Sequence, residues 1–177
     1  MSRLTPPVGP GDHILGDPGA LVTLVEYGDY ECPHCARAHA IVHEVMRRVG
    51  RDLRFVYRHF PLSQVHPHAL REAEAAEAAG TQGKFWPMHD TLFENQDAIE
   101  LEDLIGYAVI VGLDAVRFAD DLAEHTHLER VKSDFQSGAR SGVNGTPTFF
   151  IDGVRFDESW DADTLTEGLQ EAIRAKR

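Results

Sequence analysis

The chain has 177 residues, 42% of them hydrophobic and 26% charged, which are the proportions of a folded globular protein and exclude a disordered, collagen-like or coiled-coil chain. Its 29 acidic residues outnumber its 17 Lys and Arg, and the net charge of −12 would repel a nucleic-acid backbone, so we expect no nucleic-acid partner. The longest apolar stretch, residues 107–113, is far shorter than the ~20 residues that span a bilayer, and no stable membrane insertion is expected.

Residues 1–20 are rich in Pro and Gly and end in the turn sequence Asp17-Pro18-Gly19. We predict that they form an irregular N-terminal lead-in. Residues 1–10 contain one Arg, three Pro and no apolar segment, which is unlike a secretory signal. A cytoplasmic location is therefore expected, and the Met at position 1 agrees with it.

Residues 21–66 are predicted to form a strand–helix–strand unit. Leu21–Tyr27 is β-rich and mostly apolar, as expected of a buried central strand. Pro33–Val49 has apolar residues at helical spacing and is followed by Gly50, a common helix terminator. Leu53–Phe60 is a second β-rich run. Two strands joined by one helix form a parallel, right-handed unit.

Residues 67–125 show only helical patterns, and we predict a helical insertion there. Residues 126–177 return to mixed patterns and complete the sheet. The elements predicted in this last part are a helix opened by the capping box Thr126–Glu129, a hairpin of Thr148–Ile151 and Val154–Phe156, and a C-terminal amphipathic helix. The expected fold is one α/β domain whose sheet is interrupted by a helical subdomain, which suits the chain length.

The only two cysteines lie in the sequence Cys32-Pro33-His34-Cys35, where the first strand gives way to a helix. Pro is favoured at the first helical position, so Pro33 places Cys32 at the N-cap, where free backbone N–H groups and the helix dipole stabilise a thiolate. The three-residue spacing puts Cys35 on the same face, close enough for a disulfide. We expect Cys32 to attack, Cys35 to resolve, and His34 to lower the pKa of Cys32 as a neighbouring cation.

A zinc site is the main alternative use of the two thiols. Tetrahedral zinc requires four ligands, and the chain has no second Cys pair. His39 and His43 lie at i, i+4 on the predicted helix, past Cys35, and are expected to form a solvated or half-buried flank. We therefore predict no metal site.

A second motif, Gly145-Thr146-Pro147-Thr148-Phe149, precedes the predicted hairpin. With the Cys-Pro-His-Cys sequence and the helical insertion before it, the chain resembles the DsbA branch of the thioredoxin superfamily over roughly residues 20–175. The resemblance implies a thioredoxin fold and a cis Thr146–Pro147 bond packed against the cysteines. It also implies that the exposed backbone of Thr146 pairs with a bound substrate strand.

The resemblance extends to Glu26, six residues before Cys32 in an otherwise apolar strand, which matches the buried acid of that family. A carboxyl group buried alone has a raised pKa and could accept the proton of Cys35 during exchange. The alternative is a Glu at a strand end that faces solvent.

These motifs predict a protein thiol–disulfide oxidoreductase whose Cys32 forms a mixed disulfide that Cys35 resolves. No organic cofactor is implied, because the dithiol carries two electrons itself. The expected partners are protein or peptide thiols and disulfides and an unidentified redox partner. A cytosolic reductase or isomerase, a non-catalytic peptide-binding or chaperone module and a zinc module are the alternatives. Phe85, Trp86 and Phe93 could line a substrate groove, although their helical spacing is more typical of a core.

Overall fold

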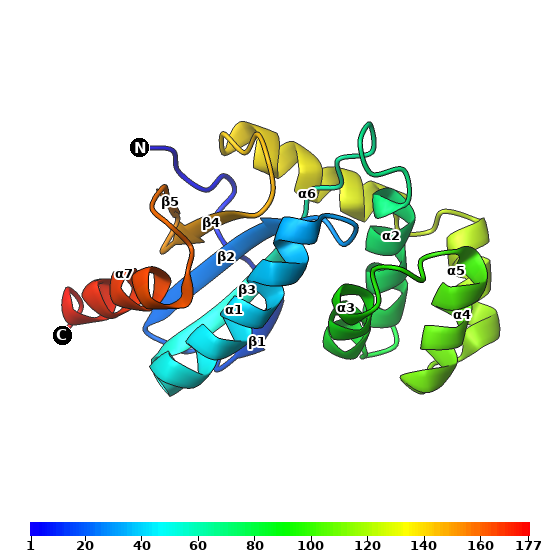
Figure 1. Ribbon diagram of the computed structural model, residues 1–177, viewed down its shortest axis with the longest axis horizontal. Helices are drawn as coiled ribbons and strands as arrows, with labels where there is room; N and C mark the ends of the chain where they lie inside the picture. Colours follow the sequence, from blue (N-terminus) through cyan, green and yellow to red (C-terminus); the bar gives the residue numbers. More distant parts are fainter.

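The computed structural model describes residues 1–177 and contains a five-stranded sheet and seven α-helices (Figure 1). The strands are β1 (His13–Gly16), β2 (Val22–Gly28), β3 (Leu53–His59), β4 (Thr148–Ile151) and β5 (Val154–Phe156). The helices are α1 (Pro33–Val49), α2 (Ala69–Gly80), α3 (Phe85–Glu94), α4 (Leu101–Ile110), α5 (Ala115–Ala123), α6 (Leu128–Arg140) and α7 (Ala162–Arg174), with a short 3₁₀ turn at Gly50–Asp52. The expected α/β class is confirmed, and α2 to α5 follow one another between β3 and α6.

The sheet has the strand order β1-β3-β2-β4-β5. β2 and β3 are parallel, as predicted, and the other neighbouring strands are antiparallel. Because β2 and β3 end at the same edge of the sheet, the segments that follow them, residues 29–32 and 60–68, lie together. This edge carries both cysteines.

Alternating side chains of β2 face two different cores. Val22 and Leu24 belong to the large core that α1 and α7 cover, while Val25 and Tyr27 belong to a smaller core on the opposite face. α6 closes this second face, and Figure 1 shows it on the other side of the sheet from α1 and α7. The alternation of a strand therefore directs Glu26, the next residue on the Leu24 side, toward α1.

A small residue lets α6 approach the sheet closely. A Cβ added to Gly138 would lie 2.6 Å from the Phe60 ring and 3.0 Å from the Tyr27 ring. Tyr27 also contacts α6 through its hydroxyl, 2.7 Å from Ser137 Oγ. Gly138 thus places α6 at the distance that this hydrogen bond requires.

The helical insertion is tied to the sheet by Glu77 of α2, whose side chain is 6% exposed. Its Oε2 atom lies 2.6 Å from His13 Nε2 in β1 and 2.9 Å from His59 Nε2 in β3. Arg130 of α6 approaches the other carboxylate oxygen at 3.4 Å. Burial would raise the pKa of Glu77, but the hydrogen bonds with His13 and His59 hold that pKa well below its usual range.

Two local features differ from the sequence expectation. Residues 13–16, predicted to be irregular, form β1, because they can pair antiparallel with the free edge of β3. The capping box predicted at Thr126–Glu129 is wrong, since α6 begins after His127 without a side-chain cap. A tight turn in which His125 has φ 52° precedes it and leaves Thr126 short of the N-cap position. A capping box instead opens α4, between Glu100 and Asp103.

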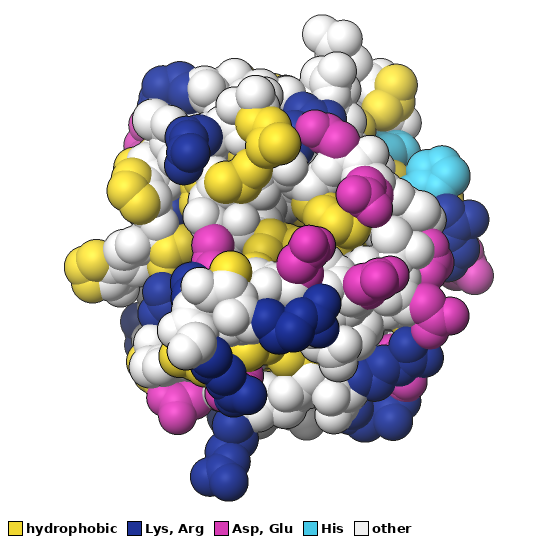
Figure 2. Space-filling view, turned by 90° about the vertical axis from the view of Figure 1, so that its left-hand side faces the viewer, with side chains coloured by type: hydrophobic (Ala, Val, Ile, Leu, Met, Phe, Trp, Pro, Cys, Tyr) yellow, Lys and Arg dark blue, Asp and Glu magenta, His cyan; other side chains and the backbone are white.

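No helix of the chain has both the length and the apolar character that a bilayer crossing requires. Figure 2 shows the face of the molecule that lies on the left in Figure 1. Positive and negative side chains are interspersed on this face, and apolar side chains are scattered among them. This face has no continuous basic patch.

Candidate active site

Cys32 occupies the N-cap of α1, with extended backbone angles (φ −73°, ψ 122°) and Pro33 in the first turn. Its backbone N–H donates to the carbonyl oxygen of Asp29 at 3.1 Å, which closes the turn that leads from β2 into the helix. Both cysteines are free thiols, Cys32 4% exposed and Cys35 fully buried. The local sequence thus places one sulfur at the surface of the site and the other one turn inside it.

The two thiols have opposite acidities. A hydrogen bond from the Cys35 thiol is the main cause that lowers the pKa of Cys32 to about 5, and burial opposes it. The Thr146 side chain and the backbone N–H groups of Cys35 and His34 lower it further. Burial, the Cys32 sulfur and the Glu26 carboxyl raise the pKa of Cys35 far above its ordinary value. At neutral pH, therefore, Cys32 is a thiolate and Cys35 keeps its proton.

His34 stands between the cysteines with an exposed side chain. Its contribution to the acidity of Cys32 comes from its backbone N–H. The ring Nδ1 lies 3.3 Å from Arg37 Nη2 on the next turn of α1. The role of its ring as a neighbouring cation stays a prediction.

The segment before β4 faces the cysteines. The Thr146–Pro147 peptide bond is cis, and Cys32 Sγ lies 3.7 Å from the Thr146 carbonyl oxygen. The Thr148 hydroxyl donates to Gly145 O at 2.7 Å and holds the turn between them. The backbone N–H of Thr146 makes no hydrogen bond with the rest of the chain, so it is free to bind an added strand.

Glu26 lies beneath the cysteines in the middle of β2, paired with Tyr57 of β3 and Phe149 of β4. It is 1% exposed, and its Oε1 atom has no hydrogen-bond partner, which excludes the solvent-facing alternative. Burial, followed by the charge of Cys32, raises the pKa of Glu26 to about 8. A carboxyl group of this kind can exchange a proton near neutral pH.

Two residues that the sequence analysis missed hold this site in place. The Gln96 side-chain amide, in the segment after α3, donates to the carbonyl oxygens of Tyr30 at 2.8 Å and of Cys32 at 2.9 Å. The buried Asp29 carboxylate accepts from the Leu62 backbone N–H at 2.9 Å. Gln96 is distant from the cysteines in the sequence and stands in no recognisable motif. Asp29 lies in the predicted break after β2, and this position next to the cysteine motif is a signal for a role at the site.

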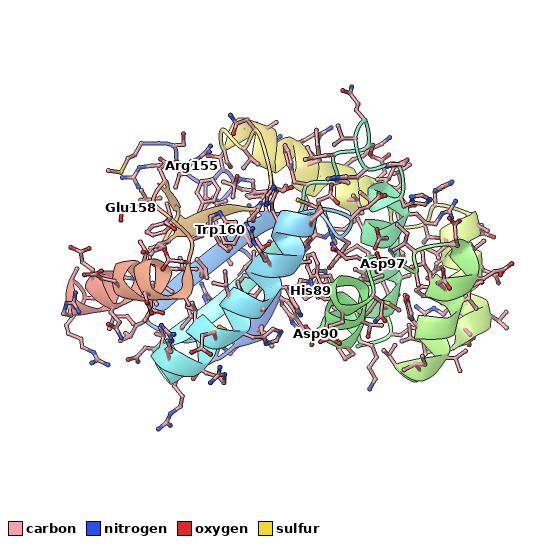
Figure 3. The ribbon with its side chains drawn as sticks, in the orientation of Figure 1. His89, Asp90, Asp97, Arg155, Glu158 and Trp160 are labelled. Carbon is pink, nitrogen blue, oxygen red and sulfur yellow. The ribbon has the colours of Figure 1, made fainter.

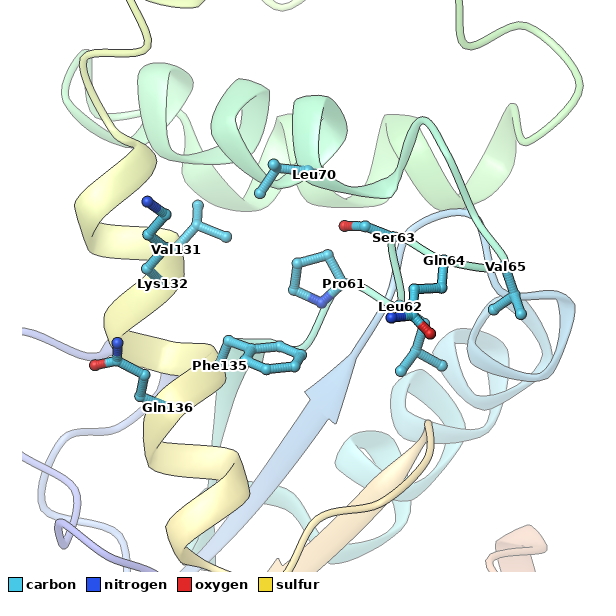
Figure 4. A pocket seen from close by; sticks show the side chains of 10 residues that line it. All are labelled: Pro61, Leu62, Ser63, Gln64, Val65, Leu70, Val131, Lys132, Phe135 and Gln136. Atoms are coloured by element: carbon cyan, nitrogen blue, oxygen red, sulfur yellow. The ribbon is translucent and has the colours of Figure 1, made fainter.

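An apolar groove of about 580 Å³ opens beside the loop that Asp29 holds (Figure 4). Its walls are the segment from Pro61 to Val65, the start of α2 and one side of α6, where Phe135 faces it. The aromatic residues that the sequence suggests for a substrate groove do not line it. Phe85 and Phe93 are 5% exposed in the core, and Trp86 packs against that core and donates to Ile14 O at 3.2 Å.

A family model described as thioredoxin matches residues 9–171. The chain belongs to the thioredoxin family. The match includes the Cys-Pro-His-Cys motif, the helical insertion and the Thr146–Pro147 segment.

Solved structures agree over nearly the whole chain. BdbD from Bacillus subtilis matches with a TM-score of 0.86 and 22% identity, covering 98% of both chains. A thioredoxin-like oxidoreductase from Silicibacter pomeroyi matches at 0.82 with 28% identity and 94% coverage of each chain. Wolbachia pipientis alpha-DsbA1 matches at 0.84 with 20% identity and complete coverage of both. The prediction of a DsbA-like thioredoxin fold is confirmed.

Similar curated proteins are much longer than this chain. A Na⁺/H⁺ antiporter NhaA 1 from Mycobacterium sp. (strain KMS) is 46% identical over 170 residues, and an NhaA antiporter from Herminiimonas arsenicoxydans is 47% identical over 175. The aligned part covers 94% and 98% of this chain but 28% of each antiporter. This chain thus spans about 28% of the length of these antiporters, and the aligned part is the thioredoxin domain of this protein.

Proposed function

We propose that this protein is a DsbA-like enzyme that exchanges disulfides with protein dithiols through Cys32 and Cys35. The observation that carries the proposal is the opposite acidity of the two sulfurs at the start of α1, one at the helix N-cap with a pKa of about 5 and one fully buried whose pKa is strongly raised. Such a pair can form and release a mixed disulfide at one sulfur only. No organic cofactor takes part, because the dithiol itself holds the two electrons.

In the oxidising direction, a substrate thiolate attacks Sγ of Cys32 in the Cys32–Cys35 disulfide. The bond between the cysteines breaks, Cys35 leaves with the electron pair and takes up a proton, and the substrate is joined to Cys32. A second substrate thiolate then attacks the substrate sulfur of this mixed disulfide and expels Cys32 as a thiolate. The substrate has lost two electrons to the protein, and a thiolate with a pKa of about 5 is a good leaving group.

Glu26 is the proposed partner for the proton of Cys35. With a pKa of about 8 it is largely protonated at neutral pH and can supply a proton when Cys35 leaves. In the reverse direction, its carboxylate accepts that proton when Cys35 attacks. Pro33 serves this chemistry by opening the helix that holds both sulfurs.

The substrate chain is proposed to pair with the free backbone N–H of Thr146, next to Pro147 and across from Cys32. The apolar groove beside Pro61–Val65 would take its hydrophobic side chains. A non-catalytic chaperone module would use the same surfaces without the thiols. Peptide binding that survives Cys32→Ser, with no disulfide exchange in the wild-type protein, would favour the chaperone.

The direction of transfer follows from which redox form is stabilised. A stabilised thiolate favours the reduced protein and makes its disulfide a strong oxidant. We expect a reduction potential nearer to about −120 mV, as for a strong oxidant, than to about −270 mV, as for thioredoxin. A value at the lower end, measured against a glutathione buffer, would favour the reductase or isomerase alternative. A cytoplasmic location stays a prediction from the sequence.

The substrates can be captured with Cys35→Ser, in which the mixed disulfide at Cys32 cannot be resolved. The variant should accumulate disulfide-linked partners that are released by a reductant, and the Cys32→Ser, Cys35→Ser double variant should accumulate none. Equal capture by both variants would mean that Cys32 is not the attacking sulfur.

The antiporter relatives support a second candidate, a redox module that acts with a Na⁺/H⁺ antiporter. Its support is the 46% identity between nearly all of this chain and 28% of one antiporter. An antiporter chain among the proteins captured from membranes by Cys35→Ser would support this partner. Capture of other proteins alone would contradict it and leave the exchange reaction unaffected.

A further inference from the structure

Two histidines of α1 and an aspartate of α3 meet at the junction between the sheet and the helical insertion. His39 and His43 are four residues apart and share one face of α1. Asp90 approaches from α3, and Figure 3 shows it on the side of that helix that faces α1. Its Oδ1 atom lies 3.5 Å from His39 Nε2 and 3.3 Å from His43 Nε2.

His39 supplies an independent reason to place a ligand here. The residue is 8% exposed, and its Nε2 atom is buried without a hydrogen-bond partner. A buried polar nitrogen without a partner is destabilising, and a bound ligand would relieve that cost. His39 lines a small cavity together with His43, Asp90 and His89, so the three candidate ligands surround one space.

The spacing of the three groups suits a tetrahedral metal ion. Ligand atoms held about 2.1 Å from zinc in a tetrahedron are about 3.4 Å apart. The two nitrogen–oxygen distances from Asp90 Oδ1, 3.3 Å to His43 and 3.5 Å to His39, lie on either side of that value. The two imidazole nitrogens and the carboxylate oxygen all lie within 4.8 Å of one another. Small side-chain rotations would therefore bring all three to bonding distance.

We propose that His39, His43 and Asp90 form a binding site for a divalent transition-metal ion, with Zn²⁺ as the preferred ion. Two imidazoles and one carboxylate are a donor set that zinc accepts, and the fourth position remains open to water or another ligand. The site is separate from the cysteines and does not depend on the proposed disulfide exchange. An ion there would join α1 to α3 and so fasten the insertion to the rest of the fold.

Binding should be measured on the oxidised protein, because the reduced dithiol would itself take up zinc. After treatment with a chelator, titration calorimetry with ZnCl₂ should give one Zn²⁺ per chain, and zinc should raise the thermal unfolding midpoint. His43→Gln and Asp90→Asn should each weaken Zn²⁺ binding at least tenfold and remove most of that rise. His43 and Asp90 have side chains that are 49% and 38% exposed, so both variants are expected to fold, which circular dichroism can check.

The chain contains a matched control for a histidine–carboxylate contact. His127 Nε2 lies 3.3 Å from Asp121 Oδ2, the same distance as that from His43 Nε2 to Asp90 Oδ1. Unlike His43 and Asp90, however, this pair has no third residue close enough to complete a metal-binding group. His127→Gln should therefore bind Zn²⁺ as the wild-type protein does. The proposal is overturned if the oxidised protein binds no stoichiometric Zn²⁺. It is also overturned if His43→Gln and Asp90→Asn bind as tightly as His127→Gln does.

Discussion

The helix α1 carries two different clusters of reactive side chains, and they are built in different ways. At its N-terminus, Cys32 and Cys35 come from one short sequence and depend on the helix start itself. Two turns further on, His39 and His43 need Asp90 from α3 to become a site. The first cluster is local in sequence, and the second exists only because the insertion folds back against α1.

The largest expected effect tests whether the two clusters are independent. Cys32→Ser should reduce the rate of disulfide exchange with a dithiol peptide by about 10³-fold or more, because it removes the sulfur that is ionised at neutral pH. The same variant should bind Zn²⁺ at the histidine pair within about twofold of the oxidised wild-type protein. Loss of both properties together would mean that the clusters act as one site.

The next prediction concerns the acidity that separates Cys32 from an ordinary thiol. In the reduced protein, ultraviolet thiolate absorbance should change with a midpoint near pH 5, and the change should be absent in Cys32→Ser. Cys35→Ser should keep a thiolate transition but at a higher pH, because the Cys35 thiol is the main donor to Cys32. A midpoint near about 8.5, the value of a free thiol, would remove the basis of the proposed chemistry.

Much of the cysteine site could be predicted from the sequence, because it depends on local helix signals. Pro33 and Gly50 are strong helix signals, and the predicted helix Pro33–Val49 is the observed one. The resemblance to the DsbA branch implied a buried Glu26, with a solvent-facing Glu as the alternative. Each of these inferences uses residues that are neighbours along the chain.

The remaining features depend on contacts between distant segments. β1 forms because β3 offers a free edge, which no pattern in residues 13–16 reveals. Gln96 and Asp90 reach α1 only after the insertion has packed, and neither stands in a recognisable motif. For the same reason the sequence offers no third ligand for His39 and His43, and it predicts no metal site.

A smaller effect is expected at Glu26, where burial holds the pKa at about 8 against 4.5 for a free carboxyl group. A raised carboxyl pKa leaves stability intact below pH 4.5 and lowers it increasingly as the pH rises to 8. In the reduced protein, to which this pKa belongs, Glu26→Gln should therefore raise the free energy of unfolding by about 2–4 kcal/mol at pH 8, and by little at pH 4.5. Urea unfolding at both pH values tests this.

Glu167, which is exposed on α7, provides the control for that experiment. Glu167→Gln should change the free energy of unfolding by less than about 0.5 kcal/mol at either pH. A gain for Glu26→Gln that is equal at both pH values would show that charge burial is not its cause.

The smallest expected effect concerns the contact between the insertion and the cysteine loop. Gln96→Ala removes two hydrogen bonds to backbone carbonyls and should lower the free energy of unfolding by about 1–2 kcal/mol. It should also slow disulfide exchange several-fold, because the Cys32 carbonyl is no longer held. Gln82→Ala is the matched control, since Gln82 makes two hydrogen bonds with the Asp114 backbone, away from the cysteines. If both variants slow exchange equally, Gln96 acts through stability alone.

Glu77 couples the unfolding of the helical insertion to that of the sheet. Its carboxylate belongs to α2 but is held by His13 and His59 of the sheet, so separating the two parts would break both hydrogen bonds and return the carboxylate to water. Because the pKa of Glu77 is depressed, this stabilisation is complete above pH 4.5 and fades only in strong acid. Near neutral pH the four inserted helices should thus melt with the strands in a single cooperative transition, rather than open as a detachable lid.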